Sequence, residues 1–426
     1  MLNELDAEVI VVGGSVSGVG TALPLAMNGI KTIVFDKAKF PRRKACASGI
    51  TGKGLEEFSY IKPFLDCNVY KSSLISPNLN DKISFTSENL DKPLLAMALN
   101  RTDFDNKLLN YLISTTDCKV KMGTEVVNVQ IKNDKAVVLT RDGKKYSSLM
   151  VVGADSTVST VAKSLKIGLF DPKLKSKKKH ILNISKEKDI IFDNSEKAKK
   201  NKLEVLTFMS FNDIKGYAWL FPKKDRVNIG VIVTLNDARA ISETLEKFEK
   251  HLVEIGEIPK NVPKENHTII AGAMLPAKSL YKKRIHKRVL LVGDAGGFCL
   301  ASSGEGIVPS LQSGKIASDV ISSLIKKYRT KKEKNQNSDN IFSKSNLKKY
   351  KKITDKAMKN EFRMLYMAQK VLINPKFNLE LIKWCKEDEK LMNNIFKSFY
   401  GEPTSLSFKL AMVSKYIKFK LKKKGN

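Results

Sequence analysis

Two short glycine-rich turns carry the residues of this chain that are best suited to chemistry. The first, Gly13-Gly-Ser-Val-Ser-Gly18, follows the apolar run at 9–12, and the second, Gly293-Asp-Ala-Gly296, follows the apolar run at 289–292. Glycines at such a turn leave backbone N–H groups bare, and a nucleotide pyrophosphate binds bare N–H groups at a helix N-terminus. Two such turns at opposite ends of one chain indicate one large cofactor held from both sides, which favours FAD over a nicotinamide alone.

The first turn needs a βαβ unit to position it. We expect a strand at 8–12, a helix at 16–28 and a second strand at 31–36. Gly13 permits the tight bend and Gly18 lets the helix pack against the strand, although Ser15 replaces the middle glycine of the usual pattern. Asp36 ends the second strand, where a carboxylate can accept hydrogen bonds from a ribose.

A basic loop, Phe40-Pro-Arg-Arg-Lys-Ala-Cys-Ala-Ser-Gly-Ile50, comes next. Its small residues let the backbone lie flat against a planar ring, which would place Cys46 beside that ring. Arg42, Arg43 and Lys44 are suited to the charge of a phosphate or of a reduced flavin. A basic surface loop with an inert, buried cysteine fits the same residues equally well.

The second turn leads into a long helix. Asp294 follows the strand at a place suited to a ribityl hydroxyl group. Ser303-Gly-Glu-Gly-Ile307 then opens a helix at 304–328, whose positive N-terminal end favours an anionic reduced flavin by up to ~2 kcal/mol in a partly buried geometry. A simple helix cap at Ser303 is the alternative, but it leaves the glycines unexplained.

Between about 170 and 280 the pattern changes to short strands with polar linkers. Alternation predicts antiparallel strands at 207–211, 217–221 and 227–233. A lysine-rich composition indicates a surface insertion at 173–202 and a mobile connection at 326–352. Residues 353–426 are expected to form helices, and the last of these, at 410–424, mixes apolar residues with lysines.

Composition limits the partners and the compartment. The chain has 426 residues with 76 Lys+Arg and 44 Asp+Glu, a net charge of +32, which favours a nucleic acid or an anionic membrane surface as partner. Lysines that only occupy solvent-facing surfaces, with no anionic partner, explain this net charge about equally well. Five scattered cysteines and four dispersed histidines argue against a disulfide framework or a metal site and for a reducing cytoplasm.

Taken together, these segments resemble the geranylgeranyl reductases, flavoproteins of the para-hydroxybenzoate hydroxylase class. The most specific match is Tyr217-Ala-Trp-Leu-Phe-Pro222, which is similar to the family's Y-x-W-x-F-P motif. The other matching motifs are the P-R-x-K-x-C element at 41–46, the R-x-x-F-D helix from Arg101 to Asp105, and the flavin-closing segments Gly293-Asp-Ala295 and Gly304-Glu-Gly-Ile307. The resemblance covers roughly residues 8–325.

The resemblance implies a fold and a set of contacts. The fold is α/β: a Rossmann-type FAD-binding domain of the para-hydroxybenzoate hydroxylase and glutathione reductase type, with an antiparallel-sheet (α+β) substrate domain and a helical C-terminal region. The expected FAD contacts are Gly13, Gly14, Ser15, Val16, Ser17, Gly18, Asp36, Arg43, Cys46, Ala47, Gly49, Arg101, Val126, Asp294, Gly304, Gly306 and Ile307. Tyr217, Trp219 and Phe221 are implied to line the isoprenoid pocket, although alternation in a strand also fits ordinary core packing.

The expected domains follow the same resemblance. The FAD-binding domain is expected at 1–75, 100–168 and 283–330, the substrate domain at 76–99 and 169–282, and the helical C-terminal region with its basic amphipathic tail at 331–426.

The chain departs from the family pattern at several positions. Ser15 and Ala47-Ser48 replace glycines, and only Gly230 remains of the G-x-G that usually follows the aromatic motif. Gly153-Ala-Asp-Ser156 is similar to the D-G element of the related hydroxylases, but Ser156 replaces its glycine. Ala162 lies near the position of an arginine that helps those enzymes to use NADPH, which argues against direct docking of NADPH here.

We therefore expect an FAD-dependent oxidoreductase acting on CH–CH groups, which saturates double bonds of geranylgeranyl chains on an archaeal-type diether lipid or its phospholipid by hydride transfer from reduced flavin. Cys46 is the candidate catalytic residue. The expected partners are the isoprenoid lipid, an anionic membrane surface bound peripherally on its cytoplasmic face through 410–424, and an electron donor such as ferredoxin or NAD(P)H, without nucleic acid or metal. The alternatives are an FAD-dependent monooxygenase or halogenase of the same fold acting on an aromatic or other hydrophobic substrate, and a non-catalytic basic binding protein.

Overall fold

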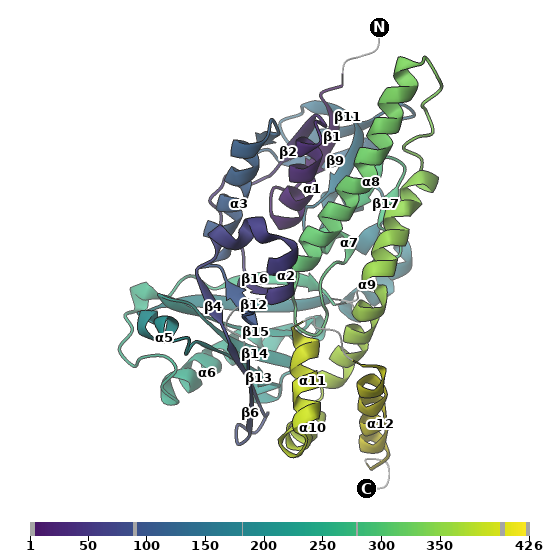
Figure 1. Cartoon of the computed structure of the whole chain (residues 1–426). Helices are drawn as coiled ribbons and strands as arrows, with labels where there is room; N and C mark the ends of the chain where they lie inside the picture. The colour runs from purple at the N-terminus through teal and green to yellow at the C-terminus, as the bar shows by residue number, and fades with distance from the viewer. Residues whose placement is uncertain (1–4, 88–91, 181, 278–279, 401–404, 423–426) are drawn as a thin grey trace. The chain divides into compact units, whose positions relative to one another are not determined.

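The chain forms two compact units in a computed structural model that describes residues 5–87, 92–180, 182–277, 280–400 and 405–422 (Figure 1). Unit 1 comprises Met1–Arg43, Thr102–Leu182 and Leu275–Tyr366, and unit 2 comprises Lys44–Arg101, Asn183–Met274 and Met367–Asn426. This division differs from the expected domains chiefly at 44–75 and 331–426. Strands within the first of these ranges pair inside unit 2, and the C-terminal helices are divided between the two units.

Unit 1 is built on an eight-stranded sheet. Its strands are β1 (Ala7–Val12), β2 (Thr32–Phe35), β8 (Lys119–Lys121), β9 (Val126–Ile131), β10 (Ala136–Thr140), β11 (Lys145–Gly153), β17 (Ile285–His286) and β18 (Val289–Leu291). The order is β17-β18-β11-β1-β2-β8; in addition β10 pairs with β11, and β9 pairs with β10. From β18 to β8 the neighbouring strands are parallel, so that their carboxyl ends share one edge of the sheet. Central strands of such a sheet are buried on both faces, and β1, β2 and β18 are accordingly apolar except for Glu8 in β1 and Thr32 in β2.

Two long helices of unit 1 pack side by side, α1 (Val16–Met27) and α8 (Ile307–Glu333) (Figure 1). Glycines permit this close approach. A Cβ on Gly20 of α1 would lie 3.2 Å from the Cα of Leu311, and a Cβ on Gly314 of α8 would lie 2.8 Å from the carbonyl carbon of Gly20. The other α-helices that lie mainly in unit 1 are α3 (Arg101–Thr115), α4 (Thr160–Ser164), α7 (Gly293–Gly296) and α9 (Lys344–Leu372).

Unit 2 contains two sheets. The seven-stranded sheet has the order β16-β12-β15-β14-β13-β5-β6, and the three-stranded sheet has the order β3-β7-β4. The strands are β3 (Gly49–Thr51), β4 (Cys67–Val69), β5 (Lys71–Ile75), β6 (Lys82–Thr86), β7 (Leu95–Met97), β12 (Leu182–Ile191), β13 (Glu204–Met209), β14 (Gly216–Pro222), β15 (Arg226–Thr234) and β16 (Ala271–Pro276). Strands β15, β14 and β13 pair antiparallel, as predicted, and β12 adds an antiparallel strand that was not predicted, whereas β13 and β5 are parallel.

Helices cover the large sheet of unit 2 through two apolar clusters. Helix α6 (Ile241–Glu254) buries Leu245, Phe248 and Leu252 against residues such as Leu220 of β14. Helices α10 (Pro375–Glu387), α11 (Glu389–Phe399) and α12 (Leu406–Lys422) pack against a second cluster that includes residues of β5 and β6. The remaining short helices of unit 2 are α2 (Gly52–Glu57) and α5 (Ser195–Lys199). Over the described ranges, no helix is both long enough and apolar enough to traverse a bilayer.

Two lysine-rich segments contain regular structure that the sequence pattern did not predict. The surface insertion expected at 173–202 is wrong for its middle part, because β12 pairs with β15 along nearly its whole length. The partly or fully buried residues of β12 include lysine, glutamate and aspartate. The sequence of β12 therefore lacks the alternation of apolar and polar residues that is typical of a strand. The mobile connection expected at 326–352 is wrong at both ends, since α8 continues to Glu333 and α9 begins at Lys344.

Candidate functional site

The first glycine turn has the geometry that a bound pyrophosphate requires. Gly13 has a φ of +106°, and a Cβ there would lie 2.3 Å from the carbonyl oxygen of Ala154. A Cβ on Gly18 would lie 1.8 Å from the carbonyl oxygen of Gly13, so the helix could not start so close to the strand with any other residue. These contacts confirm the roles predicted for the two glycines.

Asp36 lies directly beside this turn. Its buried carboxylate accepts hydrogen bonds from the backbone N–H of Gly14 and from that of Ala38, both at 2.8 Å. The predicted ribose acceptor and the glycine turn, which are about 20 residues apart in the chain, are therefore brought together by β1 and β2. Val126, another predicted contact, begins β9 shortly after Thr124, whose N–H donates to the carbonyl oxygen of Asp36 at 2.8 Å.

The second glycine turn lies against the first. Strands β1 and β18 flank β11 in the sheet, and both run into their turns at the same edge. A Cβ on Gly293 would lie 2.7 Å from the Cβ of Ser17, which places the two turns in direct contact. A Cβ on Gly306 would lie 3.5 Å from a carboxylate oxygen of Asp294, so these two predicted contacts also meet.

The residues of this paired turn fit FAD. Helix α1 begins after Ser15 and α8 begins after Gly306, and neither helix has an acidic residue in its first turn. Both N-termini can therefore attract an anionic group, such as a pyrophosphate or a reduced flavin. Gly304 has a φ of +70°, which allows the chain to turn sharply before α8.

Asp105 joins two of the matched motifs, and the sequence reasoning did not select it as a site residue. Its carboxylate accepts a hydrogen bond from the Ser15 hydroxyl at 2.8 Å and lies 3.3 Å from the Arg42 guanidinium. The serine that replaces a glycine in the turn is therefore tied to the fully buried aspartate of the R-x-x-F-D helix. Arg101, at the start of that helix, is buried, whereas Arg43 is exposed.

Unit 2 holds the part of the basic loop that carries Cys46, from Lys44 onward. The Ser48 backbone N–H donates to the Cys46 sulfur at 3.4 Å, and the Ser48 hydroxyl donates to the Cys46 carbonyl oxygen at 3.1 Å. Ser48 has a φ of +63°, the left-handed region in which the family pattern has glycine. These two bonds explain how a serine occupies that position. Ser156 of the D-G element also replaces a glycine at a positive φ, of +70°.

The aromatic motif occupies one face of β14. Ala218 and Leu220 point into the core beneath α6, so Tyr217, Trp219 and Phe221 lie on the other face. The Tyr217 and Trp219 rings are 6.0 Å apart. A Cβ on Gly49 would lie 3.2 Å from the Phe221 ring, so the motif and the Cys46 loop meet within unit 2.

Gly230 is needed to accommodate Trp219. The two residues are paired across β14 and β15, and a Cβ on Gly230 would lie 2.1 Å from the indole ring. The indole N–H donates to the Asn228 side-chain oxygen at 2.8 Å. The glycine that remains of the family's G-x-G thus provides the space in which the motif tryptophan is held.

Two buried charged residues beside the Cys46 loop were missed at the sequence level. Lys223 donates from Nζ to the carbonyl oxygen of Ala47 at 2.8 Å, and Glu187 accepts a hydrogen bond from the Cys46 backbone N–H. Burial lowers the pKa of the Lys223 ammonium group. Lys223 follows directly after the aromatic motif, and this adjacency was the one available signal. Glu187 lay inside the lysine-rich segment that resembled a surface insertion.

Glu187 predicts a pH-dependent stability. Burial raises the pKa of its carboxyl from 4.5 to about 7; the Asp189 charge also raises it, while Asn228 and Lys223 oppose this. Between these values the folded protein binds a proton that the unfolded chain has lost, so stability falls as pH rises through this window, by about 3 kcal/mol in total. From pH 5 to pH 8 the thermal midpoint of the wild type should fall by several degrees relative to that of Glu187→Gln. Parallel pH profiles for the two proteins would contradict this.

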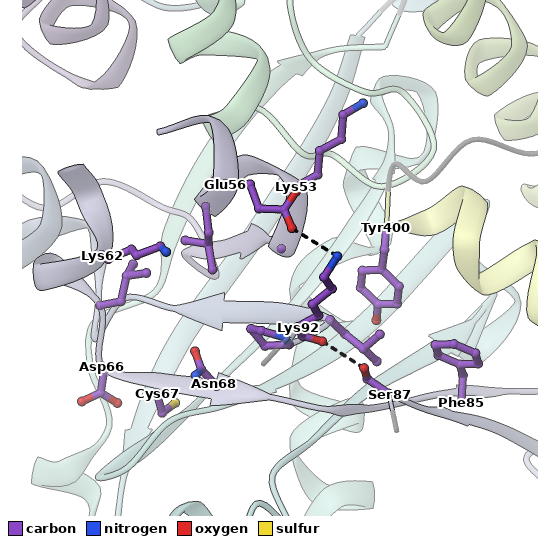
Figure 2. A pocket seen from close by; sticks show the side chains of 15 residues that line it. Lys53, Glu56, Lys62, Asp66, Cys67, Asn68, Phe85, Ser87, Lys92 and Tyr400 are labelled. Carbon is purple, nitrogen blue, oxygen red and sulfur yellow. Dashed lines mark hydrogen bonds and ion pairs between the residues drawn. The ribbon is translucent and has the colours of Figure 1, made fainter. Parts of the chain in front are cut away.

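Unit 2 also contains a pocket with a volume of about 910 Å³ (Figure 2). Its lining combines apolar side chains, among them Leu55, Phe85 and Tyr400, with the lysines Lys53 and Lys92. The residues that line it are Gly52, Lys53, Leu55, Glu56, Lys62, Leu65, Asp66, Cys67, Asn68, Phe85, Ser87, Lys92, Pro93, Leu94 and Tyr400. The aromatic motif does not line this pocket, but Phe221 packs against the same apolar cluster as Cys67 and Tyr400 of its wall.

Within the residues that the structure describes, no three His, Cys, Asp or Glu side chains are grouped so that they could hold a metal ion. Burial raises the pKa of the Cys67 thiol to about 12, so this pocket residue is a neutral thiol at physiological pH.

Known proteins are similar to this chain in sequence and in fold. Digeranylgeranylglycerophospholipid reductase 2 of Methanosphaera stadtmanae is 27% identical over 379 residues, which cover 87% of this chain and 88% of the relative. A geranylgeranyl bacteriochlorophyll reductase-like protein of Thermoplasma acidophilum has a similar structure, with a TM-score of 0.74 at 19% identity over 88% of this chain and 90% of that one. The halogenase PltM, crystallised with phloroglucinol and FAD, has a TM-score of 0.61 at 13% identity over 90% and 84% of the two chains.

These similarities confirm the predicted resemblance to geranylgeranyl reductases and the predicted fold class, an FAD-binding α/β fold of the para-hydroxybenzoate hydroxylase type with an antiparallel sheet and C-terminal helices. The sequence profile of the FAD binding domain family matches residues 6–332, a range that includes both glycine turns and the Cys46 loop. The chain therefore belongs to the FAD binding domain family, and FAD is its cofactor.

Proposed function

We propose that this protein is a reductase that saturates carbon–carbon double bonds of geranylgeranyl chains, on archaeal-type diether lipids or their phospholipids. The observation that carries the proposal is the contact between the Cys46 loop and the aromatic strand, at Gly49 and Phe221. The name of the Methanosphaera relative, digeranylgeranylglycerophospholipid reductase, supports the same substrate class.

The chemistry requires a precise position more than a strong acid or base. Bound FAD, once reduced, supplies a hydride. An isolated trisubstituted alkene has no carbonyl group to polarise, so the residues must hold the double bond in place and exclude water. We assign this task to Tyr217, Trp219 and Phe221 as the lining of the isoprenoid site. We assign to Cys46 the positioning of the double bond or assistance to the proton donor.

The cofactor contacts remain those expected from the resemblance. Gly13 to Gly18 and Asp36 are proposed to bind the pyrophosphate and ribose, and the geometry of the turn supports this. The other proposed contacts are Arg43, Cys46, Ala47, Gly49, Arg101, Val126, Asp294, Gly304, Gly306 and Ile307. For the electron donor we propose a carrier such as ferredoxin or NAD(P)H. Ala162 is buried in α4 and supplies no cation for the 2′-phosphate of NADPH.

We propose that the pocket of Figure 2 receives part of the lipid, with the anionic headgroup at its lysines. The volume of about 910 Å³ is at the upper end of the range of ligand sites. Lys53, Lys62 and Lys92 are exposed at the pocket, and Lys92 lies 3.7 Å from Glu56. A mixed lining of this kind suits an amphiphile with a phosphate at one end.

Replacing these three lysines together by glutamine should raise the KM for a phospholipid substrate about tenfold, because charge-assisted contacts to phosphate are lost. The KM for the corresponding alcohol, which carries no phosphate, should not change. Lys199, Lys200 and Lys247 are exposed lysines elsewhere in unit 2, and their triple glutamine variant is the matched control. Equal changes for both substrates would place the headgroup outside this pocket.

Helix α12 is proposed to bind an anionic membrane surface from the cytoplasmic side. Leu410, Val413, Ile417 and Leu421 are between 51% and 63% exposed and fall on one side of the helix. A bilayer is the occupant that fits this stripe, because the chain carries a net charge of +32 and Lys418 lies exposed on the same helix.

Anaerobic incubation with dithionite and candidate isoprenoids tests the reaction. Mass spectrometry should show a gain of two hydrogens for each saturated bond, and Cys46→Ser should reduce turnover or alter the pattern of products. Unchanged turnover and products would remove Cys46 from the mechanism. Oxygen-dependent modification of an aromatic substrate would support a monooxygenase or halogenase instead, and a purified protein without flavin colour would support a binding protein.

A further inference from the structure

A buried polar network lies behind the Cys46 loop in unit 2. Glu187 of β12 is 5% exposed, Lys223 after β14 is 1% exposed and Asn228 of β15 is 2% exposed. Ionisable side chains are rarely buried so completely unless they are paired. Glu187 and Lys223 must therefore each be held by specific hydrogen bonds. The proposed chemistry does not use either charge directly.

The orientation of the Asn228 side chain is determined by Trp219. The indole N–H can only donate, so the side-chain oxygen of Asn228 must face it, at 2.8 Å. The Asn228 amide nitrogen then donates to Glu187 at 2.8 Å and to Asp189 at 2.9 Å. Glu187 must therefore present an acceptor to Asn228. Both oxygens of a carboxylate can accept, whereas an amide at this position could turn its NH₂ group toward Asn228 instead.

The same two charged residues hold the backbone of the loop. Glu187 accepts from the Cys46 N–H, and Lys223 donates to the carbonyl oxygens of Ala47 and Ala98. Two backbone groups on either side of the 46–47 peptide are thus held, one by a buried acidic side chain and the other by a buried basic one. Glu187 belongs to β12 and Lys223 directly follows β14, and these two strands flank β15 in the large sheet.

Other charged groups surround this pair. Asp189 lies on the same strand as Glu187, and the Arg226 guanidinium is 3.7 Å from the Asp189 carboxylate. Asp189, Cys67, Cys46 and Glu187 act on Lys223 in the direction that favours its charged form, against the effect of burial. Asp225 also pairs with the Arg226 guanidinium, at 2.8 Å, so the network combines three acidic side chains with two basic ones.

We propose that Glu187 and Lys223 are positioning residues that fix the peptide groups of Cys46 and Ala47, and that Asn228 couples this clamp to Trp219 of the aromatic motif. The clamp determines where the thiol and the indole lie with respect to each other. Its relevance to alkene reduction rests on the proposed function, whereas the clamp itself is a property of unit 2.

The rate at which iodoacetamide alkylates Cys46 in the FAD-loaded protein tests this proposal. Peptide mass spectrometry separates Cys46 from the other four cysteines. In Glu187→Gln the glutamine amide can place a donor against the Asn228 donor, and in Lys223→Met two carbonyl oxygens lose their partner. Each variant should alkylate Cys46 at least about fivefold faster than the wild type. The buried Cys118 and Cys385 should stay unreactive and so report an intact fold.

Lys224→Met is the matched control, because Lys224 is the next residue and is exposed. Each single variant leaves the other charged side chain buried without its partner, which can prevent folding. The double variant Glu187→Gln/Lys223→Met removes both charges and avoids this problem. It should show the same faster alkylation, together with a shift in Trp219 fluorescence measured in a Trp384→Phe background. Wild-type reactivity of Cys46 in a folded double variant would overturn the clamp. Failure of the isoprenoid assay would overturn the proposed function and leave this result standing.

Discussion

Replacing Asp36 by alanine is expected to weaken FAD binding about 30- to 150-fold, because hydrogen bonds to a charged acceptor contribute about 2–3 kcal/mol when they are lost. The carboxylate lies against the glycine turn, where its oxygens accept from the N–H groups of Gly14 and Ala38. Its removal would take away the proposed ribose acceptor and loosen the turn at the same time. Titration of the apoprotein with FAD, followed by flavin fluorescence, measures the effect.

Asp36→Asn separates these two contributions. Asparagine keeps one oxygen for the Gly14 N–H but loses the charge, so its affinity should lie between those of the wild type and the alanine variant. Asp319→Ala is the control, since this aspartate is exposed on α8 and pairs only with Lys315 among the interactions described for it. An unchanged dissociation constant in Asp36→Ala would mean that the ribose is bound by other residues.

The nucleotide-binding part of the fold could be predicted because its constraints are steric and local. A residue other than glycine at position 13 or 18 would overlap backbone atoms of the neighbouring segments, so the spacing of the glycines already implies the strand, the turn and the helix. The contact between Gly293 and Ser17 follows from two parallel strands ending at one sheet edge. The recurring strand and glycine pattern predicted that both turns hold one cofactor, and the strand order brings the two turns together.

The clamp could not be predicted, because its residues meet only through the pairing of distant strands. Glu187 lies in a segment in which Lys186 and Lys188 flank it, and that pattern indicates a solvated surface. Burial of Glu187 depends on β12 pairing with β15, where Asn228 supplies the hydrogen bond. Asp105 is similar, since its partners Ser15 and Arg42 come from other motifs. Charge at a single position does not reveal whether the fold supplies a partner.

The serines that replace glycines of the family pattern differ in whether their backbone is strained. This difference is visible in the backbone φ angles and not in the sequence. Ser48 and Ser156 occupy positive φ, so they replace glycine at positions with a conformational cost of about 1 kcal/mol. Ser15 has a φ of −88° and carries no such cost. Its side chain instead makes a new hydrogen bond to Asp105. The substituted glycines thus include two positions with backbone strain, Ser48 and Ser156, and one without it, Ser15.

Helix α12 has two apolar faces, and only one of them is used inside the protein. Phe408, Met412, Tyr416 and Phe419 pack against the cluster around Phe377, with the Tyr416 and Phe419 rings 5.5 and 5.4 Å from the Phe377 ring. The exposed stripe of Leu410, Val413, Ile417 and Leu421 lies on the opposite side. Lys415 places its ammonium group over the ring of Trp384, at 4.8 Å, and Trp384 belongs to the cluster at the inner face. The Lys415 side chain therefore does not cover the stripe. The helix is therefore anchored by one face while the other is available to a bilayer.

Replacing the four stripe residues by asparagine should lower the affinity for vesicles of phosphatidylglycerol and phosphatidylcholine about 100- to 1,000-fold, at roughly 1 kcal/mol for each partly buried side chain. Co-sedimentation with the vesicles at low and high salt measures the binding, and salt should weaken what remains, since the residual attraction is electrostatic. Ile269→Asn/Ile270→Asn is the matched control, because these side chains are exposed elsewhere in unit 2. Truncation before Leu410 is less informative, since it also removes the inner face from its cluster. An unchanged vesicle-bound fraction in the four-residue variant would show that α12 does not mediate attachment to the membrane.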